Sequence, residues 1–401
     1  MSIELAPLPV ADPLALPDLA RSLQYEHLVW DAFVAGKRRV DLHPIVLSEQ
    51  MHEQAKRVAV RAVELVSRPP SEEERRHYKL HPDIERLAAA ARAAGDLGSL
   101  ARVDLLLRED GRFVACEVNA DCPGGHNETV ALPRLARAAG MRRGFDPTDV
   151  APRLADRLVA LSGGKGSPRG AIALVYATAW AEDLQVVAFL ERLVRERGGR
   201  PIRAPITALT GDPISIRGER VSVLYRFYPL EYLAEMPNVE ALTRATERGE
   251  LSSMSSFAVI HAQSKLAMAR AFVHAPDEAR DVFPETIAFA GADRTALARD
   301  RGEWVLKRDL SRVGDHVIVG ALATDDEMRA AVNDVEELEK DGDVWIAQRF
   351  IPQRAIETPW GLRLLTLGVY VLDGTFAGYF ARLTRTSHCS HDALVLPVFV
   401  G

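Results

Sequence analysis

The stretch ACEVNADCPGGHNE, residues 115–128, brings two cysteines, a Gly-Gly pair and a histidine beside Glu117 and Asn119. The residues before it, RVDLLLREDGRFV at 102–114, alternate in polarity up to a turn signal at 109–112. A period of two is typical of β-strands, and polar residues with a glycine mark turns. The pattern therefore predicts a hairpin whose second strand, 113–118, leads into the glycine-rich stretch.

One face of this hairpin is expected to carry its polar side chains. Residues two apart on a strand point to the same side, so Arg102 accompanies Asp104 and Glu117 accompanies Asn119. If the two faces coincide, two carboxylates and an amide oxygen lie together, and Mg²⁺ prefers such ligands. The arginine could stabilise a developing anion. An exposed hairpin with solvated charges would show the same alternation.

The composition is that of an ordinary globular protein, with 47% apolar and 26% charged residues. A chain of 401 residues indicates two or three lobes, and a net charge of -6 argues against a dedicated nucleic-acid binder. No apolar run reaches the ~18 residues of a membrane span, and the acidic, proline-containing start lacks the pattern of a secretion signal. Three cysteines form no disulfide framework. We therefore expect a cytoplasmic protein without a membrane or nucleic-acid partner.

The hydrophobic pattern predicts helices at 45–67, 82–95 and 257–273. A glycine-rich linker at 162–170 precedes a strand, an amphipathic helix and an extended piece within 171–206, which predicts a parallel, doubly wound layer. Later strands are expected at 303–310, 316–322, 344–351, 363–374 and 375–384, with the last two joined by an Asp-Gly turn.

Two lysines are candidate phosphate ligands, and both have plainer interpretations. Lys307 ends a predicted strand before a Ser-Arg-x-Gly loop, whose backbone N–H groups could contact phosphates. The Walker A pattern is absent, and a plain hairpin would look the same. Lys265 stands alone in an apolar helical segment, where a surface lysine is common. Residues 345–352 could offer backbone groups to a purine or form an edge strand.

The cysteines give little support to metal or nucleophile chemistry. Cys116 and Cys122 lack CxxC spacing, so zinc is not expected. Cys116 alternates with Glu117 and is expected to point into the core, whereas Cys122 lies in the glycine-rich loop and could contact a substrate. A cysteine mechanism with His126 is disfavoured, because local adjacency does not build such sites. Residues 384–392, TRTSHCSHD, are expected to form a loop over the site.

The order of these pieces resembles one known family. RVDLLLREDGRFVACEVNADCPGGHNE resembles the R-x-D … E-x-N-A-D-x-P segment of the glutathionylspermidine synthase-like ATP-grasp family. SKLAMARAF, WVLKRDLSRVGDHV, WIAQRFIP and GVYVLDGTFAGYFARL follow in the family's order, and residues 173–233 look like its pre-ATP-grasp region. The resemblance covers roughly residues 95–401, and the EVNAD segment is its specific part.

The resemblance implies an α/β and α+β fold, in which a Rossmann-like pre-ATP-grasp layer joins a circularly permuted ATP-grasp fold. It divides the chain into a helical lead-in at 1–94, a metal-binding hairpin and helix at 95–160, a pre-ATP-grasp region at 165–250 and a nucleotide-binding lobe at 251–401.

By similarity, the hairpin and the later lobe would bind ATP and Mg²⁺. The metal ligands would be Asp104, Glu117 and Asn119. The residues facing the reacting phosphate or the tetrahedral intermediate would be Arg102 and Arg382. The residues contacting ATP would be Lys265, Lys307, Ser311, Arg312 and Gly314 at the phosphates, with Gln348 and Phe350 at adenine.

The substrate loop departs from the family pattern. After EVNAD the family usually continues with Thr-Pro and a Ser or Thr, whereas here a cysteine, a proline and a Gly-Gly pair follow. Glutathione and spermidine are therefore not carried over, and no stretch has the motif of the amidase domain found in bifunctional relatives. The residues expected near a substrate are Cys122, Asn127, Glu128, Glu182, Asp183 and Glu231. Acidic residues near Glu182 and Asp183 bind a polyamine in the family, but acids in a first helical turn also favour the helix dipole.

The activity that the resemblance implies is ATP-dependent ligation of a carboxylate to an amine through an acyl phosphate. The partners would be a small-molecule or peptide carboxylate and an amine. One alternative is a non-catalytic or regulatory nucleotide-binding protein on an ATP-grasp scaffold. Another is a phosphotransferase, which would need a phospho-accepting histidine such as His388 or His391. No motif sets an oligomeric state.

Overall fold

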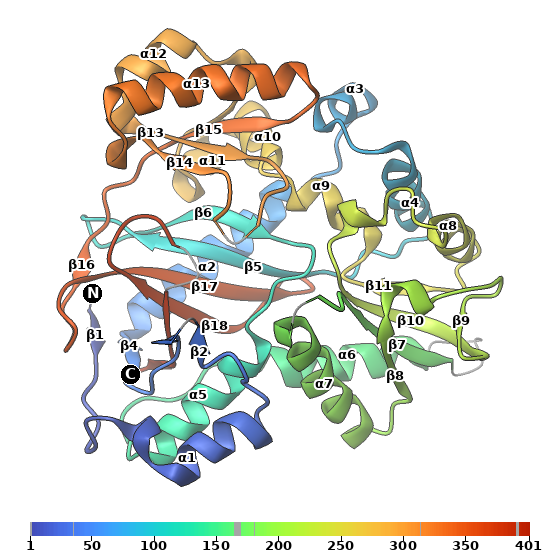
Figure 1. Cartoon of the computed structure of the whole chain (residues 1–401), viewed down its shortest axis with the longest axis horizontal. Coiled ribbons are helices and arrows are strands. Elements are labelled where there is room, and N and C mark those ends of the chain that lie inside the picture. Colours follow the sequence, from blue (N-terminus) through green and yellow to red (C-terminus); the bar gives the residue numbers. More distant parts are fainter. Residues whose placement is uncertain (1, 35, 164–169, 180, 313, 390–392) are drawn as a thin grey trace.

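The computed structural model describes residues 2–34, 36–163, 170–179, 181–312, 314–389 and 393–401. A central antiparallel sheet has a smaller lobe above it, a parallel sheet beside it, and both chain ends near its opposite side (Figure 1). Helices and sheets are mixed, so the predicted α/β and α+β class is confirmed. Most of the linker predicted at 162–170 lies outside the described residues. In the part of the chain that the structure describes, no helix is long and apolar enough to cross a membrane.

The central sheet joins two hairpins that lie far apart in the sequence. The predicted early hairpin is β5 (Leu100–Leu107) with β6 (Phe113–Asn119), and the late one is β17 (Arg363–Leu372) with β18 (Thr375–Thr384). β5 pairs antiparallel with β17, which gives the strand order β19-β18-β17-β5-β6. The late hairpin turns at Asp373 and Gly374, whose φ angles of 47° and 76° suit the predicted Asp-Gly turn. Two short strands complete the sheet, β16 (Ala355–Ile356) and β19 (Leu394–Leu396).

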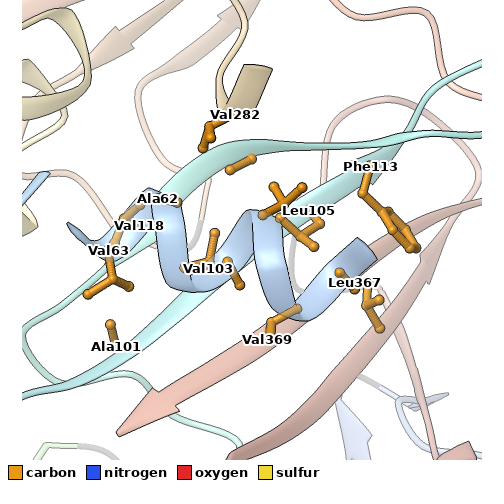
Figure 2. Close-up of a cluster of buried hydrophobic side chains, with 14 of the residues drawn as sticks. Ala62, Val63, Ala101, Val103, Leu105, Phe113, Val118, Val282, Leu367 and Val369 are labelled. Carbon is orange, nitrogen blue, oxygen red and sulfur yellow. The ribbon is translucent and has the colours of Figure 1, made fainter. Parts of the chain in front are cut away.

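One face of this sheet is buried by α2 (Glu49–Val66). Figure 2 shows Ala62 and Val63 of α2 together with Val103, Leu105 and Val369 of the sheet. Each fully buried aliphatic side chain contributes roughly 1.5–3 kcal/mol relative to exposure. Because α2 covers the apolar side chains of β5, the alternating polar ones are left on the other face.

The helix predicted at 45–67 begins later than expected. Residues Ile45–Leu47 form β4, which lies between β1 (Ile3–Leu5) and β20 (Val398–Val400). The Ser48 side chain then accepts a hydrogen bond from the Met51 N–H and caps α2. A short apolar run fits a strand and a helix equally well, so periodicity does not locate this boundary.

The predicted β-α-β region is confirmed as a parallel sheet. β7 (Ala171–Tyr176) pairs in parallel with β8 (Pro201–Pro205) and with β10 (Glu219–Phe227), which also pairs with β11 (Ser252–Met254). The amphipathic α7 (Ala181–Glu196) connects β7 to β8. Elements that flank this sheet are α4 (Pro82–Ala93), where a helix was expected at 82–95, α6 (Val150–Ser162), α8 (Val239–Glu247) and β9 (Ser215–Ile216).

The later lobe is an antiparallel sheet in the order β12-β15-β13-β14. Its core includes Leu306, Ala347 and Trp345 of the sheet and Met328 of a covering helix. The strands predicted at 303–310 and 344–351 are thereby confirmed, whereas the strand predicted at 316–322 is limited to Val317–Val319 because Gly320–Leu322 forms a turn. The elements of the lobe are β12 (Thr286–Ala288), β13 (Trp304–Arg308), β14 (Val317–Val319), β15 (Trp345–Arg349), α12 (Arg294–Arg299) and α13 (Asp325–Lys340).

The helix predicted at 257–273 is broken into two. α9 (Ile260–Gln263) ends before Ser264, whose backbone is extended, and α10 (Leu266–His274) begins after Lys265. The buried Asp309 carboxylate accepts hydrogen bonds from the Ser264 hydroxyl at 2.8 Å and the Leu266 N–H at 3.2 Å. This cap comes from the turn after β13, far along the chain, so helical spacing cannot reveal the break.

The remaining helices and strands are short or cover edges. α5 (His126–Ala138) packs against β18, α6 and α7. The others are α1 (Pro17–Arg21), α3 (Glu72–Arg75), α11 (Pro276–Val282), β2 (Phe33–Val34) and β3 (Lys37–Arg38), with single turns at Pro13–Ala15, Ser22–Glu26, Arg76–Tyr78, Ile206–Ala208, Leu230–Leu233, Phe257–Val259, Phe289–Gly291, Arg301–Glu303 and Gly320–Leu322.

Candidate functional site

The pairing of β5 with β6 places the four polar hairpin residues on one face. Arg102 lies directly opposite Asn119, and Asp104 lies directly opposite Glu117. A bulge follows, because the next pair is Leu105 with Ala115 and Cys116 is the extra residue. The bulge shifts the alternation by one, so that Ala115 joins the core face while Glu117 stays with Asp104.

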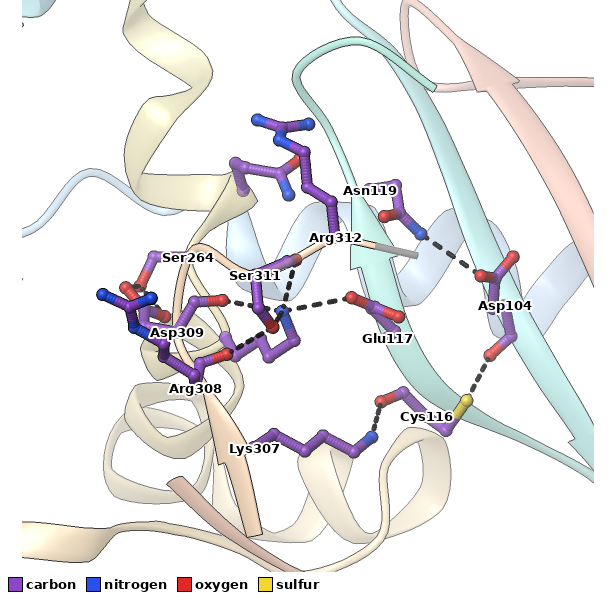
Figure 3. Close-up of polar contacts among 12 residues, drawn as sticks. Asp104, Cys116, Glu117, Asn119, Ser264, Lys307, Arg308, Asp309, Ser311 and Arg312 are labelled. Carbon is purple, nitrogen blue, oxygen red and sulfur yellow. Dashed lines mark hydrogen bonds and ion pairs between the residues drawn. The ribbon is translucent and has the colours of Figure 1, made fainter. Parts of the chain in front are cut away.

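The bulge also corrects the expectation that Cys116 points into the core. This residue is half-buried, and its thiol donates to the backbone carbonyl of Asp104 at 3.3 Å. Its own carbonyl accepts a hydrogen bond from the Lys307 ammonium at 3.0 Å. Cys116 therefore links the hairpin to the later lobe (Figure 3).

Asp104 is the centre of the polar face. Its Oδ1 accepts from Nε of Arg102 at 2.9 Å, while its Oδ2 accepts from Nη2 of Arg382 at 2.6 Å and from the Asn119 amide at 3.3 Å. Burial alone would raise the pKa of Asp104, but the two guanidinium groups hold that pKa well below its usual range. Asp104 therefore stays ionised, and Arg382 of β18 shares it with the hairpin.

Lys265 reaches this face from the break before α10. Its ammonium donates to the carbonyls of Asp309 at 2.6 Å and Ser311 at 3.2 Å, and pairs with the Glu117 carboxylate at 3.2 Å. The side chain is only 3% exposed, so the surface-lysine interpretation does not hold. Lys265 bridges the hairpin and the predicted phosphate loop.

Lys307 approaches from β13 and is buried. Its ammonium donates to the Gln348 side-chain oxygen at 2.7 Å, and the Gln348 amide donates to the Thr286 hydroxyl at 3.0 Å. Within the described ranges, Lys307 has neutral oxygens as partners and no carboxylate. A buried cation without an opposite charge is costly, which is the arrangement expected where a ligand supplies the anion. Phe350, predicted at adenine, follows β15 and is half-buried.

Arg312 connects the predicted phosphate loop to the predicted substrate loop, residues 122–128, and to the parallel-sheet region. Its guanidinium donates to both Glu231 oxygens at 2.9 and 3.0 Å, to Asp121 at 3.2 Å and to the Cys122 sulfur at 3.4 Å. Ser311 and Gly314 flank it, while residue 313 of this loop lies outside the described residues.

The loop predicted over the site contacts the predicted phosphate loop through its described part, residues 384–389. The His388 ring Nε2 lies 3.1 Å from the carbonyl oxygen of Gly314. Gly314 has a φ of 75°, and a Cβ there would approach the Cys389 carbonyl oxygen to 2.8 Å. A side chain at position 314 would therefore separate the two loops. Residues 390–392 of this loop, including His391, lie outside the described residues.

The predicted substrate residues fall into three places. Cys122 and Glu231 surround Arg312, whereas Glu182 is exposed and Asp183 half-buried at the start of α7. The other two, Asn127 and Glu128, are buried in the first turn of α5.

Asn127 and Glu128 serve the protein's own packing. The Asn127 amide donates to the carbonyls of His27 at 3.0 Å and Leu28 at 3.1 Å, and Glu128 forms an ion pair with Arg39. Both side chains are buried, at 0% and 3% exposure. Their contacts therefore join the start of α5 to the N-terminal segment, and their role at a substrate stays a prediction.

Asp121 and Arg226 form a buried ion pair that the sequence pattern does not predict. Both side chains are 0% exposed, and the Asp121 carboxylate also accepts from the Leu230 N–H at 2.9 Å. The pair fixes the loop after β6 to the end of β10. An aspartate next to a strand end gives no sign that it is buried. The one sequence feature that could have drawn attention to Asp121 is its place inside the EVNAD segment.

The donor set fits a hard divalent cation beside phosphate groups. Asp104, Glu117 and Asn119 supply two carboxylates and an amide oxygen, and such cations keep waters and phosphate oxygens as further ligands. Among the residues that the structure describes, no group of three or more His, Cys, Asp and Glu side chains is arranged for a metal. Among the described residues the buried Nε of Arg382 has no hydrogen-bond partner, which leaves a donor for an anion.

Asp183 allows a test of the electrostatics at the start of α7. Burial, and then the neighbouring Glu182 carboxylate, raises the pKa of Asp183 from 3.8 to about 6. The folded protein thus binds this proton more tightly than the unfolded chain. The stability contributed by the group falls as the pH rises from about 4 to about 6 and is constant above.

Replacing Asp183 with asparagine is expected to raise the free energy of unfolding by roughly 1–2 kcal/mol at neutral pH, with little gain near pH 4. Urea denaturation at the two pH values measures this difference. Glu196→Gln, an exposed change at the end of the same helix, is the matched control. An equal gain at both pH values would contradict the assigned titration.

Comparison with known proteins gives one family and a related fold. The family model for glutathionylspermidine synthase pre-ATP-grasp matches residues 40–400. A glutathione synthetase-like effector from Globodera pallida shares the fold, with a TM-score of 0.64 and 13% identity over 99% of this chain and 100% of that one. A putative gamma-glutamylcysteine synthetase from Methylobacillus flagellatus KT covers 85% of each chain, with a TM-score of 0.42 and 12% identity. No curated protein matches significantly.

Proposed function

Because the chain belongs to the glutathionylspermidine synthase pre-ATP-grasp family, we propose that it is an ATP- and Mg²⁺-dependent ligase joining a carboxylate to an amine. The observation that carries the proposal is the meeting of Arg102 and Arg382 at Asp104, with Lys265 and Lys307 reaching the same hairpin from the later lobe. Four cations around a face that holds two carboxylates suit a substrate that brings several negative charges.

ATP would bind with its phosphates at Lys265, Lys307 and the loop of Ser311, Arg312 and Gly314. Both lysine ammonium groups now donate to carbonyl or amide oxygens, which phosphate oxygens would replace. Gln348 and Phe350 would lie at the adenine end. Apart from Lys265, which precedes α10, these residues come from the four-stranded lobe and its loops, so this lobe is the proposed nucleotide-binding part of the chain.

Asp104, Glu117 and Asn119 would hold the Mg²⁺ ion, which when bound neutralises charge on the phosphates. The pairing of β5 with β6 would position these three ligands for the ion, because it fixes their side chains on one face of the hairpin. The two arginines would then face the group being transferred.

The reaction that suits this site has two steps. The substrate carboxylate oxygen attacks the γ-phosphorus of ATP, the bond to ADP breaks, and an acyl phosphate forms. The amine nitrogen attacks the acyl carbon, loses a proton and expels phosphate, which leaves an amide. Arg102 and Arg382 would stabilise the negative charge in both steps. No protein nucleophile takes part, which agrees with the thiols, because burial raises the pKa of Cys116 and Cys122 to about 12.

The test is the release of ADP and phosphate from Mg-ATP in the presence of amino acids, small peptides and polyamines, singly and in pairs. Release that requires one acid and one amine would establish the ligase and name its substrates. ATP binding with no release from any pair would contradict a small-molecule ligase and favour the regulatory nucleotide-binding alternative.

Cys122→Ala is expected to leave kcat within about 3-fold of the wild type and to change one KM by up to about 10-fold. The sulfur accepts one hydrogen bond, from Arg312 at 3.4 Å, and its high pKa leaves almost no thiolate at neutral pH. Steady-state ADP release over a range of each substrate measures both constants. A folded variant that turns over no substrate at all would restore a cysteine mechanism.

A further inference from the structure

Both arginines at Asp104 lie against one aromatic ring. The guanidinium carbons of Arg102 and Arg382 lie 5.3 and 5.7 Å from the centre of the Phe380 ring. Phe380 precedes Arg382 by two positions on β18, so the two side chains share a face, and the ring is 7% exposed. A cation within about 6 Å of a ring centre is attracted by the quadrupole of the ring.

A glycine on the middle strand makes room for this arrangement. Gly368 of β17 pairs with Asp104 on one side and with Phe380 on the other. A Cβ at Gly368 would lie 2.8 Å from Cδ of Arg102 and 2.9 Å from the Phe380 carbonyl oxygen. The absence of a side chain therefore lets Arg102 cross from β5 over β17 towards the ring.

The far end of Arg102 and the ring are fixed by the substrate loop. The Arg102 guanidinium donates to the Gly124 carbonyl at 3.2 Å, and the Tyr370 hydroxyl donates to the same oxygen. A Cβ at Gly125 would lie 2.7 Å from Cε2 of Phe380, so the loop packs directly on the ring edge. Strand β17, the Phe380 ring and the loop at Gly124 and Gly125 thus pack together and hold the Arg102 side chain in place.

The charges explain why a ring is needed at this position. Arg102 and Arg382 repel one another and share the single carboxylate of Asp104. That carboxylate is also the proposed ligand of the metal ion, so its hold on the guanidinium groups would weaken when it binds the ion. The quadrupole of Phe380 attracts both cations whatever Asp104 binds.

We propose, resting on the ligase function above, that Phe380 and Gly368 are positioning residues that aim Arg102 and Arg382 at the transferring phosphoryl group. Phe380 acts on both arginines through its ring, and Gly368 acts on Arg102 alone through its lack of a side chain. Neither residue needs to touch a substrate.

The first experiment maps arginine accessibility in the full-length protein without any substrate. Phenylglyoxal labels guanidinium groups, and peptide mass spectrometry reports the labelling rate at each position. Arg102 and Arg382 have 12% and 18% exposed side chains, so slow labelling is expected in the wild type. Phe380→Leu is expected to speed labelling of both by about 5-fold, which corresponds to the loss of a partly buried cation–π contact.

Matched variants distinguish the effect of the aromatic ring from the effects of side-chain volume and of a general loss of packing. Phe380→Tyr keeps an aromatic face and is expected to restore near wild-type labelling. Gly368→Ala is expected to speed labelling of Arg102 only. Phe376→Leu removes another ring of β18, one that lies 5.9 Å from the Lys56 ammonium, and is expected to change neither arginine. Thermal unfolding of each variant shows whether it folds. If Phe380→Leu does not fold, Gly368→Ala still tests the positioning of Arg102.

The second readout is steady-state kinetics with the substrates found by the ligase test. Phe380→Leu is expected to lower kcat on the order of 10-fold while leaving the KM for ATP within about 2-fold, because the arginines act on the transition state. Phe380→Tyr is expected to restore kcat.

Unchanged labelling of both arginines in folded Phe380→Leu, or equal labelling in the tyrosine and leucine variants, would overturn the role of the ring. Unchanged labelling of Arg102 in Gly368→Ala would overturn the role of the glycine. A wild-type protein with no ligase activity but with the predicted labelling pattern would remove the proposed function and leave the positioning of the arginines intact.

Discussion

Replacing Asp104 with asparagine is expected to lower the rate of ADP formation by at least about 1,000-fold, a loss of roughly 4 kcal/mol of transition-state stabilisation. Asp104 holds Arg102 and Arg382 together and is the buried carboxylate of the proposed metal site. Asparagine keeps the shape and one oxygen but removes the negative charge that both guanidinium groups share. Single-turnover ADP release with saturating Mg-ATP and both substrates measures the effect.

The matched control is Asp110→Asn in the turn of the same hairpin, where the carboxylate accepts hydrogen bonds from the exposed Arg112. This variant is expected to keep wild-type turnover. Glu117→Gln provides a second test at a more exposed carboxylate, with 27% side-chain exposure, and is expected to abolish turnover while retaining the circular dichroism spectrum of the wild type. Normal turnover in folded Asp104→Asn or Glu117→Gln would remove the metal and phosphate assignment.

Replacing Arg226 with methionine is expected to lower the free energy of unfolding by about 3–5 kcal/mol. The change leaves the fully buried Asp121 carboxylate without its closest cation, while the half-buried Arg312 and the Leu230 N–H remain as partners. The arginines hold the pKa of Asp121 below its usual range against burial, so the carboxylate stays charged at neutral pH. Urea denaturation followed by circular dichroism gives the free energy.

The double variant Arg226→Met, Asp121→Asn identifies the cause of this loss. Asparagine keeps an acceptor for the Leu230 N–H but carries no charge, so the double variant is expected to be more stable than the single one. Arg248→Met, which removes an exposed ion pair with Asp212, is expected to leave the stability nearly unchanged. A double variant no more stable than Arg226→Met would show that an unpaired buried charge is not the reason.

The hairpin residues were predictable from the sequence because strand geometry is local. A period of two places Arg102 with Asp104 and Glu117 with Asn119, and the turn at 109–112 brings the strands together. The bulge at Cys116 was not predictable, since an extra residue leaves no mark in an alternating pattern. The shared polar face of the hairpin is therefore predicted correctly, and the direction of this cysteine incorrectly.

Features that depend on contacts between distant segments could not be predicted from the local sequence pattern. Ser264 and Lys265 continue a helical period, and the Asp309 carboxylate, from the turn after a later strand, explains the break that brings Lys265 to Glu117. Residues Ile45–Leu47 become a strand because β1 and β20 lie on either side. Asn127 is a polar residue in a glycine-rich stretch, which suggests a substrate contact, but its amide donates to backbone carbonyls of the N-terminal segment.

The pairing of β5 with β17 has a consequence for how the protein is made in the cell. While a ribosome is still synthesising residues 120–362, the early hairpin has no partner along β5, and its backbone donors and acceptors remain open to other chains. Contacts between such distant segments also slow folding. Nascent chains that stop before residue 363 would therefore expose the unpaired edge of β5, where other chains could add a strand.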